Sequence, residues 1–309
     1  MPCDTPIIVE NVKDFEKIPV PCGNCPPCKK RRVDAWVFRL MQEDKVSDAA
    51  HFVTLTYDTR SIPLTKNGFM TLYKKDFQNF MKRLRKLHGR NKKSIRYYAV
   101  GEYGTHNERP HYHAIIFNVK DAESYTRAWS LTENGYETRA ANMVEDGNVY
   151  GGRFDHYGEG RILLGSIDVG QVGQNSVAYV AKYMDKKAII PKHDRDDRKK
   201  EFSLMSKGLG KNYLTPEIIR FHKRHLDKLY ITKPGGIKIA MPKYYRDKIF
   251  DQTEKDAQLD IIAAAMEEKI SEERARIEGR GINYGHWLAN SKKGRIRRFE
   301  RFNSKNRNL

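Results

Sequence analysis

The architecture of this protein rests on residues 95–118, which read IRYYAVGEYGTHNERPHYHAIIFN. Apolar and aromatic residues dominate 95–103 and 111–118, and this composition predicts two β-strands. About seven residues, 104–110, lie between the two segments. We therefore expect the strands to pair as an antiparallel hairpin.

The flanking sequence predicts helices and further strands on both sides of the hairpin. The segment 75–88 is an amphipathic helix, because apolar residues recur there at helical spacing: Phe77, Phe80, Met81, Leu84 and Leu87. Further helices are expected at 33–43, 124–131, 176–187 and 251–277, and another helix is expected to begin at 215. Strands are expected at 51–57 and 162–172. The remaining segments are a long surface loop at 133–160, a mobile charged segment at 192–200 and a loop at 203–210. Strands that run before and after helices favour an α+β fold with an antiparallel sheet.

Three regions differ in composition. Residues 1–33 form a cysteine-containing, irregular leader, and 34–245 hold the strands and most of the motifs. Residues 246–309 are expected to be a helical extension that becomes polybasic and flexible from residue 291, with Phe299 and Phe302 among the basic residues. Such a tail could bind a nucleic-acid backbone and stack on bases, or it could simply be solvated.

The net charge restricts the class of partner. The chain has 309 residues and a formal charge of +19, which favours nucleic acid or an anionic membrane. No stretch approaches the roughly 20 apolar residues of a membrane span, and the start of the sequence lacks the pattern of a signal peptide. No phosphate-binding loop of the ATPase type occurs, since residues 208–211 lack its spacing. An intracellular nucleic-acid-binding protein that does not hydrolyse ATP is expected.

His111 and His113 are candidate metal ligands. Alternate side chains of a strand face the same way, so the two imidazoles share one face and Tyr112 points to the other. Glu102 would lie close to them if the hairpin forms. One carboxylate and two imidazoles with open positions suit a catalytic Mg²⁺ or Mn²⁺. The alternative is two surface histidines and a solvated glutamate.

Tyr179 and Tyr183 are candidate nucleophiles. On a helix, positions i and i+4 are neighbours, so the two phenols share a face with Lys182 beside them. A phenol has a pKa near 10 and needs a nearby cation to attack at neutral pH. A cation held by the histidine pair would polarise the phosphate that a tyrosine attacks, and the tyrosine pair would supply the nucleophile for that cation site. The alternative is that both tyrosines are core anchors.

Cys22, Cys25 and Cys28 have the spacing of thiolate ligands. Three such residues could hold a structural Zn²⁺, which normally needs a fourth ligand, either Cys3 or a histidine. Free or buried thiols are the alternative.

Several of these segments resemble the HUH endonuclease superfamily. Residues 52–57 resemble its first motif, residues 109–113 its second, and Tyr179 with Lys182 its third. The segments 22–36 (CGNCPPCKKRRVDAW), 179–187, 202–210 and 241–245 narrow the resemblance to replication initiators of gokushovirus-type Microviridae, over residues 20–245. Tyr112 departs from the aliphatic residue common at that position, which matters little if it faces away.

The resemblance implies a ferredoxin-like or RRM-like sheet and a metal-dependent nickase. In this reading Glu102, His111 and His113 hold the cation, Tyr179 attacks origin DNA, and Tyr183 acts in the second strand transfer. The partners are single-stranded or melted origin DNA with a host helicase and DNA polymerase, in the cytoplasm of a bacterial host. Rival hypotheses are a transposase or relaxase of the same superfamily, a non-catalytic single-strand-binding protein, and a zinc-containing capsid or packaging protein.

Overall fold

The computed structural model describes residues 3–10, 17–90, 92–104, 107–149, 160–173, 177, 190–233 and 235–305. Internal contacts divide the chain into two compact units. One unit is continuous and comprises Arg39–Lys211, whereas the other combines Met1–Phe38 with Asn212–Leu309. The boundaries that composition suggests, after residues 33 and 245, stay predictions.

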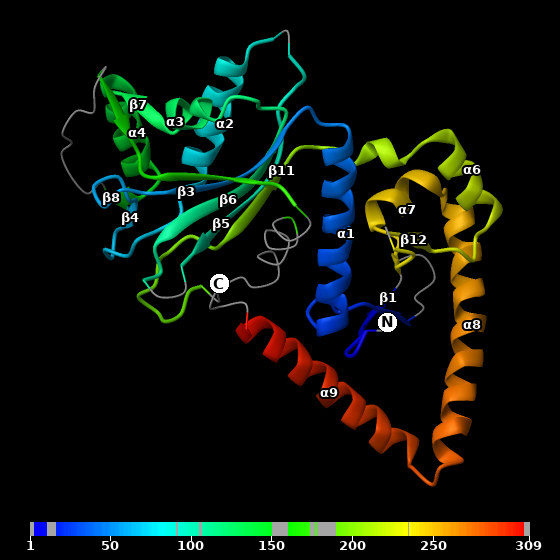
Figure 1. Ribbon diagram of the computed structural model, residues 1–309. Coiled ribbons are helices and arrows are strands. Elements are labelled where there is room, and N and C mark those ends of the chain that lie inside the picture. The colour runs from blue at the N-terminus through cyan, green and yellow to red at the C-terminus, as the bar shows by residue number, and fades with distance from the viewer. Residues whose placement is uncertain are drawn as a thin grey trace. The chain divides into compact units, whose positions relative to one another are not determined.

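A five-stranded antiparallel sheet forms the centre of the continuous unit (Figure 1). Its strands, in spatial order, are β10 (Ile167–Gln171), β3 (Ala50–Thr56), β6 (Pro110–Phe117), β5 (Arg96–Tyr103) and β11 (Phe202–Met205). β5 and β6 form the predicted hairpin, and β6 lies at the middle of the sheet between β3 and β5. The α+β fold with an antiparallel sheet, expected from the sequence, is confirmed.

Among the described residues of this unit, a group of helices covers one face of the sheet, as Figure 1 shows. They are α2 (Lys74–His88), α3 (Glu123–Ala128) and α4 (Glu133–Glu145), accompanied by the short strands β4 (Leu64–Thr65), β7 (Ser130–Thr132), β8 (Asn148–Val149) and β9 (Arg161–Leu163). The amphipathic pattern of α2 places Phe77, Phe80 and Leu84 in the core, where they are fully buried. These side chains pack with Val53, Ala114 and other residues of the inner sheet face.

Several elements differ from the sequence-based expectations. The predicted loop at 133–160 contains α4 and β8, because Thr132 caps the helix by accepting a hydrogen bond from Gly135 N–H. The predicted strand at 162–172 is two strands, β9 and β10. They separate at Gly165, where an added Cβ would lie 2.2 Å from the carbonyl oxygen of Thr56. The predicted loop at 203–210 begins with strand β11.

The second unit is mainly helical. Its elements are β1 (Ile7–Glu10), β2 (Lys17–Val20), the start of α1 (Pro26–Lys45), a 3-10 turn at Lys211–Tyr213, α6 (Pro216–Arg224), β12 (Tyr230–Thr232), β13 (Lys238–Ala240), α7 (Lys243–Ile249), α8 (Gln252–Glu278) and α9 (Tyr284–Lys305). A small core joins Phe38 to Ile231, Tyr245 and Phe250. The leader is therefore not irregular throughout, since it holds a hairpin and the first turns of α1.

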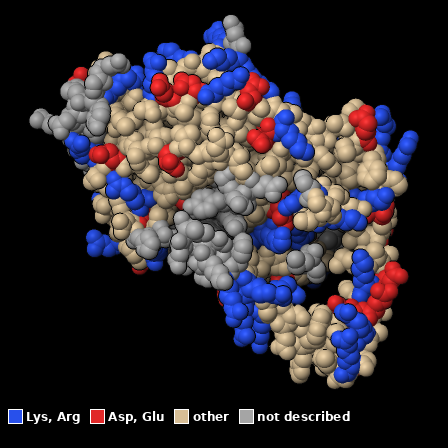
Figure 2. Space-filling model, in the orientation of Figure 1, with Lys and Arg blue, Asp and Glu red and all other residues tan. Residues whose placement is uncertain are grey.

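The polybasic C-terminal segment is helical. α9 extends through residues that were expected to be flexible from 291 onward. Its sequence YGHWLANSKKGRIRRFERFNSK contains seven lysines and arginines and a single acidic residue, Glu300. Figure 2 shows these basic side chains as a blue cluster on the helix. The basic residues of this segment are thus presented along a helix.

No helix within the described residues is both long and apolar enough to span a membrane.

Candidate active site

Glu102, His111 and His113 converge on the sheet face opposite the helices α2 and α3. The strand register sets Glu102 of β5 directly across from His111 of β6. Glu102 Oε1 lies 2.8 Å from His111 Nε2 and 3.2 Å from His113 Nε2. The predicted proximity of these three residues is therefore confirmed, and one carboxylate oxygen lies between two imidazole nitrogens.

Each imidazole is oriented through its other nitrogen. His111 Nδ1 lies 2.9 Å from the carbonyl oxygen of Arg109, so this nitrogen carries a hydrogen and donates it. His113 Nδ1 lies 3.0 Å from the Thr54 hydroxyl, in β3. Phe52 stacks on the His113 ring at a centroid distance of 5.4 Å. These partners direct both Nε2 atoms toward Glu102, as outer partners of metal-binding histidines commonly do.

The charges of the three groups depend on one another. Burial opposes ionisation of Glu102, but the hydrogen bonds from His111 and His113 outweigh it and lower the pKa of Glu102. Burial also disfavours a charged His111, yet the contact with Glu102 outweighs it and raises the pKa of His111. Because His111 Nδ1 already donates its hydrogen to Arg109, a positive charge is needed where His111 Nε2 faces the Glu102 carboxylate. That charge can be a proton or a metal ion.

The donor set fits a divalent cation. The three ligand atoms lie within 4.8 Å of one another. Glu102 is buried, and its Oε2 has no hydrogen-bond partner among the described residues. A buried carboxylate oxygen without a partner is costly, and coordination would remove that cost. Two imidazoles and a carboxylate suit Mn²⁺ and, with added water, Mg²⁺.

Tyr112 points away from this site, as the alternation of the strand predicts. It is fully buried, and its hydroxyl lies 2.7 Å from the Tyr57 hydroxyl and donates to the Tyr73 carbonyl at 2.9 Å. Tyr57 donates to Asp76, which also pairs with Arg139. Burial raises the pKa of both Tyr57 and Tyr112 well above the ordinary value. These two phenols are structural and unsuited to nucleophilic attack.

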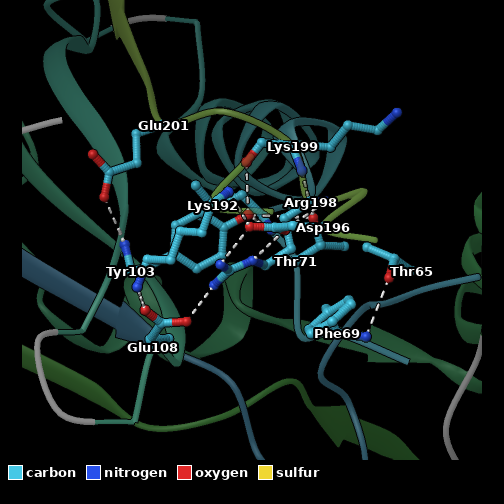
Figure 3. A network of polar contacts seen from close by, with 11 residues as sticks. Thr65, Phe69, Thr71, Tyr103, Glu108, Lys192, Asp196, Arg198, Lys199 and Glu201 are labelled. Atoms are coloured by element: carbon cyan, nitrogen blue, oxygen red, sulfur yellow. Dashed lines mark hydrogen bonds and ion pairs between the residues drawn. The ribbon is translucent and has the colours of Figure 1, made fainter. Parts of the chain in front are cut away.

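A polar network beside the site escaped sequence reasoning. The segment 192–200, expected to be mobile, is held by a buried ion pair in which Arg198 binds Asp196 at 2.8 Å and Glu108 at 2.6 Å (Figure 3). Lys199 accepts a hydrogen bond from the Tyr103 hydroxyl through its carbonyl oxygen. The only available signal was the balance of charges in KHDRDDRKKE, residues 192–201.

This network fixes the strand end that carries Glu102. The Tyr103 N–H, next in the chain, donates to Glu201 Oε1 at 3.1 Å, as Figure 3 shows. The Thr71 hydroxyl accepts from Lys199 N–H and contacts the Tyr103 hydroxyl. The segment 192–201 therefore helps to position Glu102, although it contributes no ligand to the cluster.

Asp168 is a further acidic residue on the same sheet face. It is exposed and lies in β10 directly across from Thr54, which in turn is across from His113. Sequence reasoning missed it because Asp168 belongs to a strand far along the chain and carries no motif. Only the strand order shows that Asp168, Thr54 and His113 lie side by side on three neighbouring strands.

Three of the remaining predicted site residues are not described by the structure, and the other three lie in the second unit. Tyr179, Lys182 and Tyr183 lie outside the described residues. Cys22, Cys25 and Cys28 lie in the other unit, together with Cys3. The catalytic roles of the tyrosines and of Lys182 thus stay predictions.

The sequence has relatives among phage proteins. A sequence model of the family described as replication-associated protein ORF2/G2P matches residues 50–188. The chain is 27% identical over 242 residues to the replication-associated protein VP4 of Bdellovibrio phage phiMH2K, covering 76% of this chain and 69% of that protein. It is 28% identical over 291 residues to the replication-associated protein ORF2 of Spiroplasma virus 4, covering 85% and 84%.

A third relative is the replication-associated protein ORF4 of Chlamydia phage 1, which is 24% identical over 81% of this chain and 58% of its own length. No solved structure matches the chain. The matched region contains the whole Glu102, His111 and His113 cluster and the segment with both candidate tyrosines. Residues 50–188 are therefore similar to the replication-associated protein ORF2/G2P family, and the chain as a whole is similar to replication-associated proteins of phages.

Proposed function

We propose that this protein is a replication initiator that nicks origin single-stranded DNA and starts rolling-circle replication of a small circular phage genome. The observation that carries the proposal is the convergence of Glu102, His111 and His113 on one sheet face. The phage relatives, named for replication, and the positive charge of the chain support the same reading. The motif order of the HUH superfamily adds the nicking chemistry.

The protein groups at this site would hold and orient a divalent cation. His111 and His113 offer their Nε2 atoms because their Nδ1 atoms are engaged by Arg109 and Thr54. Glu102 supplies negative charge from a buried position. When bound, Mg²⁺ or Mn²⁺ would polarise the scissile phosphate and stabilise the charge that develops on it.

The phenol of Tyr179 attacks the scissile phosphorus in the proposed reaction. A phosphorus–oxygen bond forms to the tyrosine while the bond to the 3′ oxygen breaks, and the departing oxygen takes a proton. The products are a 5′-phosphotyrosine link and a 3′-OH primer. Lys182 would stabilise phenolate or phosphate charge. Tyr183 repeats the attack on the regenerated junction, and the freed 3′-OH then resolves the first link to release a circle.

This exchange conserves the energy of the phosphodiester bond, so rejoining needs no ATP. The sequence contains no phosphate-binding loop of the ATPase type, which agrees with a reaction that needs no ATP. Strand separation and synthesis would therefore be supplied by a host helicase and a host DNA polymerase.

A covalent-adduct assay tests the proposal. The full chain is incubated with labelled single-stranded fragments that tile the genome encoding it, with Mg²⁺ or Mn²⁺, and analysed under denaturing conditions. We expect one fragment to give an SDS-resistant adduct that EDTA abolishes, with the label mapping to the peptide containing Tyr179. Binding of DNA without any adduct, and without metal dependence, would favour the non-catalytic single-strand-binding alternative.

Matched variants assign the roles. His111→Ala with His113→Ala should abolish the adduct, whereas His88→Ala, at the end of α2, should leave it intact. Tyr179→Phe should prevent the first adduct. An adduct that persists in Tyr179→Phe and disappears in Tyr183→Phe would reverse the order of the two nucleophiles. An adduct that persists when both are phenylalanine would refute the tyrosine mechanism.

A further inference from the structure

Four cysteines from two separate segments, residue 3 and residues 22–28, meet at one point. Their sulfur atoms, from Cys3, Cys22, Cys25 and Cys28, all lie within 4.8 Å of one another. Cys3 precedes β1, Cys22 follows β2, and the other two belong to the turn before α1 and its first residues. Zinc bound to four thiolates at about 2.3 Å separates the sulfurs by roughly 3.8 Å. The Sγ atoms of Cys3 and Cys25 lie 3.6 Å apart, close to that separation.

We propose that these four cysteines form a structural zinc site completed by Cys3. The spacing of the other three residues pointed to thiolate ligands but left the fourth ligand open. The hairpin explains why Cys3 is the fourth: Ile7 pairs with Val20, so the chain before β1 runs beside the chain after β2. The proposal is independent of the nicking reaction.

The surrounding N–H groups are arranged for thiolates. Asn24 N–H and Cys25 N–H donate to Cys22 Sγ at 3.4 and 3.3 Å. Asp4 N–H donates to Cys25 Sγ at 3.4 Å, and Cys22 N–H donates to Cys3 Sγ at 3.3 Å. Such donors are the usual outer partners of metal-bound ligands. They stabilise negative sulfur, which four neighbouring thiolates could carry only with a cation between them.

The weak local core supplies a second argument. The apolar residues of β1 are exposed, with 51% of Ile7, 58% of Ile8 and 41% of Val9 open to solvent. A two-stranded hairpin is marginally stable by itself. Among the described strands, β1 and β2 pair only with each other, so burial within the pair provides little stabilisation. A metal that crosslinks both ends of the hairpin to α1 would provide it.

The electrostatic environment matches a zinc–thiolate centre. Zinc with four thiolates carries a charge of about −2. The basic run Lys29, Lys30, Arg31 and Arg32 directly follows Cys28, and the Arg31 guanidinium lies 3.7 Å from Cys28 Sγ. Residues next to the cysteines also contact the basic helix α9. Asp4, next to Cys3, binds Arg295 at 2.6 Å, and Lys29 lies over the Phe299 ring.

Metal analysis of the full chain tests the proposal. Protein purified under reducing conditions without added chelator should contain about one zinc per chain. Cys3→Ser should weaken zinc retention against a competing chelator by at least about tenfold, the loss seen on removing even an outer partner. His111→Ala with His113→Ala should keep its zinc, which separates this site from the sheet cluster. Thr5→Ser, which keeps the hydroxyl donor to Cys22, is the conservative control.

Cobalt spectroscopy decides the ligand set even if Cys3→Ser fails to fold. Co²⁺ added to metal-free wild-type protein should give the intense visible bands of a tetrahedral site, with charge-transfer absorption corresponding to four thiolates. Absorption corresponding to three thiolates would overturn the role of Cys3. Zinc-free wild-type protein that is as stable as the zinc-containing protein would overturn the site altogether. Disulfides among the four cysteines in the reduced preparation would also overturn it.

Discussion

His113 illustrates how much of the site depends on single hydrogen bonds. Its ring is held by the Thr54 hydroxyl on one side and by stacking on Phe52 on the other. Thr54 is therefore a positioning residue under the proposed function, because it fixes which nitrogen of His113 faces Glu102. Thr56, two residues along the same strand, bonds to Ser166 and to none of the histidines that the structure describes.

Replacing Thr54 by valine should weaken metal activation without preventing folding. The loss of an outer partner of a metal-binding histidine typically lowers metal affinity by about 10- to 100-fold. We expect the Mn²⁺ concentration for half-maximal adduct formation to rise by that factor, with a near-normal rate at saturating metal. Thr56→Val is the matched control. Equal metal dependence in the two variants would contradict the role assigned to Thr54.

The element that carries the ligands is supported from its other face. Tyr112 lies between His111 and His113 in β6, and its hydroxyl ties the strand to Tyr73, just before α2. One side of β6 thus carries the candidate metal ligands, whereas the other side packs into the core.

Tyr112→Phe should destabilise the fold and leave the ligands in place. Removing the hydroxyl leaves the buried Tyr73 N–H and carbonyl without this partner, which costs about 1–3 kcal/mol. Urea denaturation should show this loss in the free energy of unfolding. Tyr97→Phe, in the neighbouring strand, serves as the control and should change stability far less. A variant of unchanged stability would mean that water replaces the hydroxyl.

Sequence reasoning succeeded where contacts are local and failed where they are distant. The hairpin, the shared face of Glu102, His111 and His113, and helix α2 follow from spacing over a few residues. By contrast, the fixed position of Asp196 depends on Arg198 meeting Glu108, some 90 residues earlier in the chain. Likewise, only the paired strands β1 and β2 bring Cys3 to Cys25. The periodicity of a single sequence contains no information about contacts between residues so far apart in the chain.

At the scale of the whole molecule, charge acts both inside the structure and on its surface. The hydrogen bonds from Arg198 hold the pKa of Asp196 well below its usual range. A carboxylate with a lowered folded-state pKa stabilises the fold above its unfolded-state pKa, about 3.9. That contribution is lost progressively as the pH falls below this value.

Asp196→Asn should therefore have a pH-dependent cost. At pH 7 we expect a loss of about 3 kcal/mol in the free energy of unfolding, since Arg198 would lose its buried partner. The difference from wild type should shrink as the pH falls below about 4. Denaturant unfolding at pH 7 and at a pH below about 4 measures this difference in stability, with the exposed Asp194→Asn as control. A difference that stays constant with pH would contradict the ion pair as its source.

The basic surface of α9 should contribute to DNA affinity through counterion release. Lys293→Gln with Arg297→Gln removes two exposed charges from this helix. If both contact backbone phosphates, the slope of log affinity against log salt concentration for single-stranded DNA should decrease by about 1.4. Lys243→Gln with Lys248→Gln, on α7, is the charge-matched control. An unchanged slope in the α9 variant would exclude this helix from the binding surface.

The closeness of Glu102 to His113 along the chain bears on how the protein matures during synthesis. All three candidate ligands belong to one hairpin that ends at Phe117. Contacts between near neighbours in sequence form early, because little loop entropy opposes them. A nascent chain can thus bring these three side chains together while the tyrosine-bearing segment is still untranslated. In the proposed enzyme, assembly of the metal centre would precede arrival of the nucleophile, so no cleavage-competent intermediate forms on the ribosome before the strand-transfer residues are made.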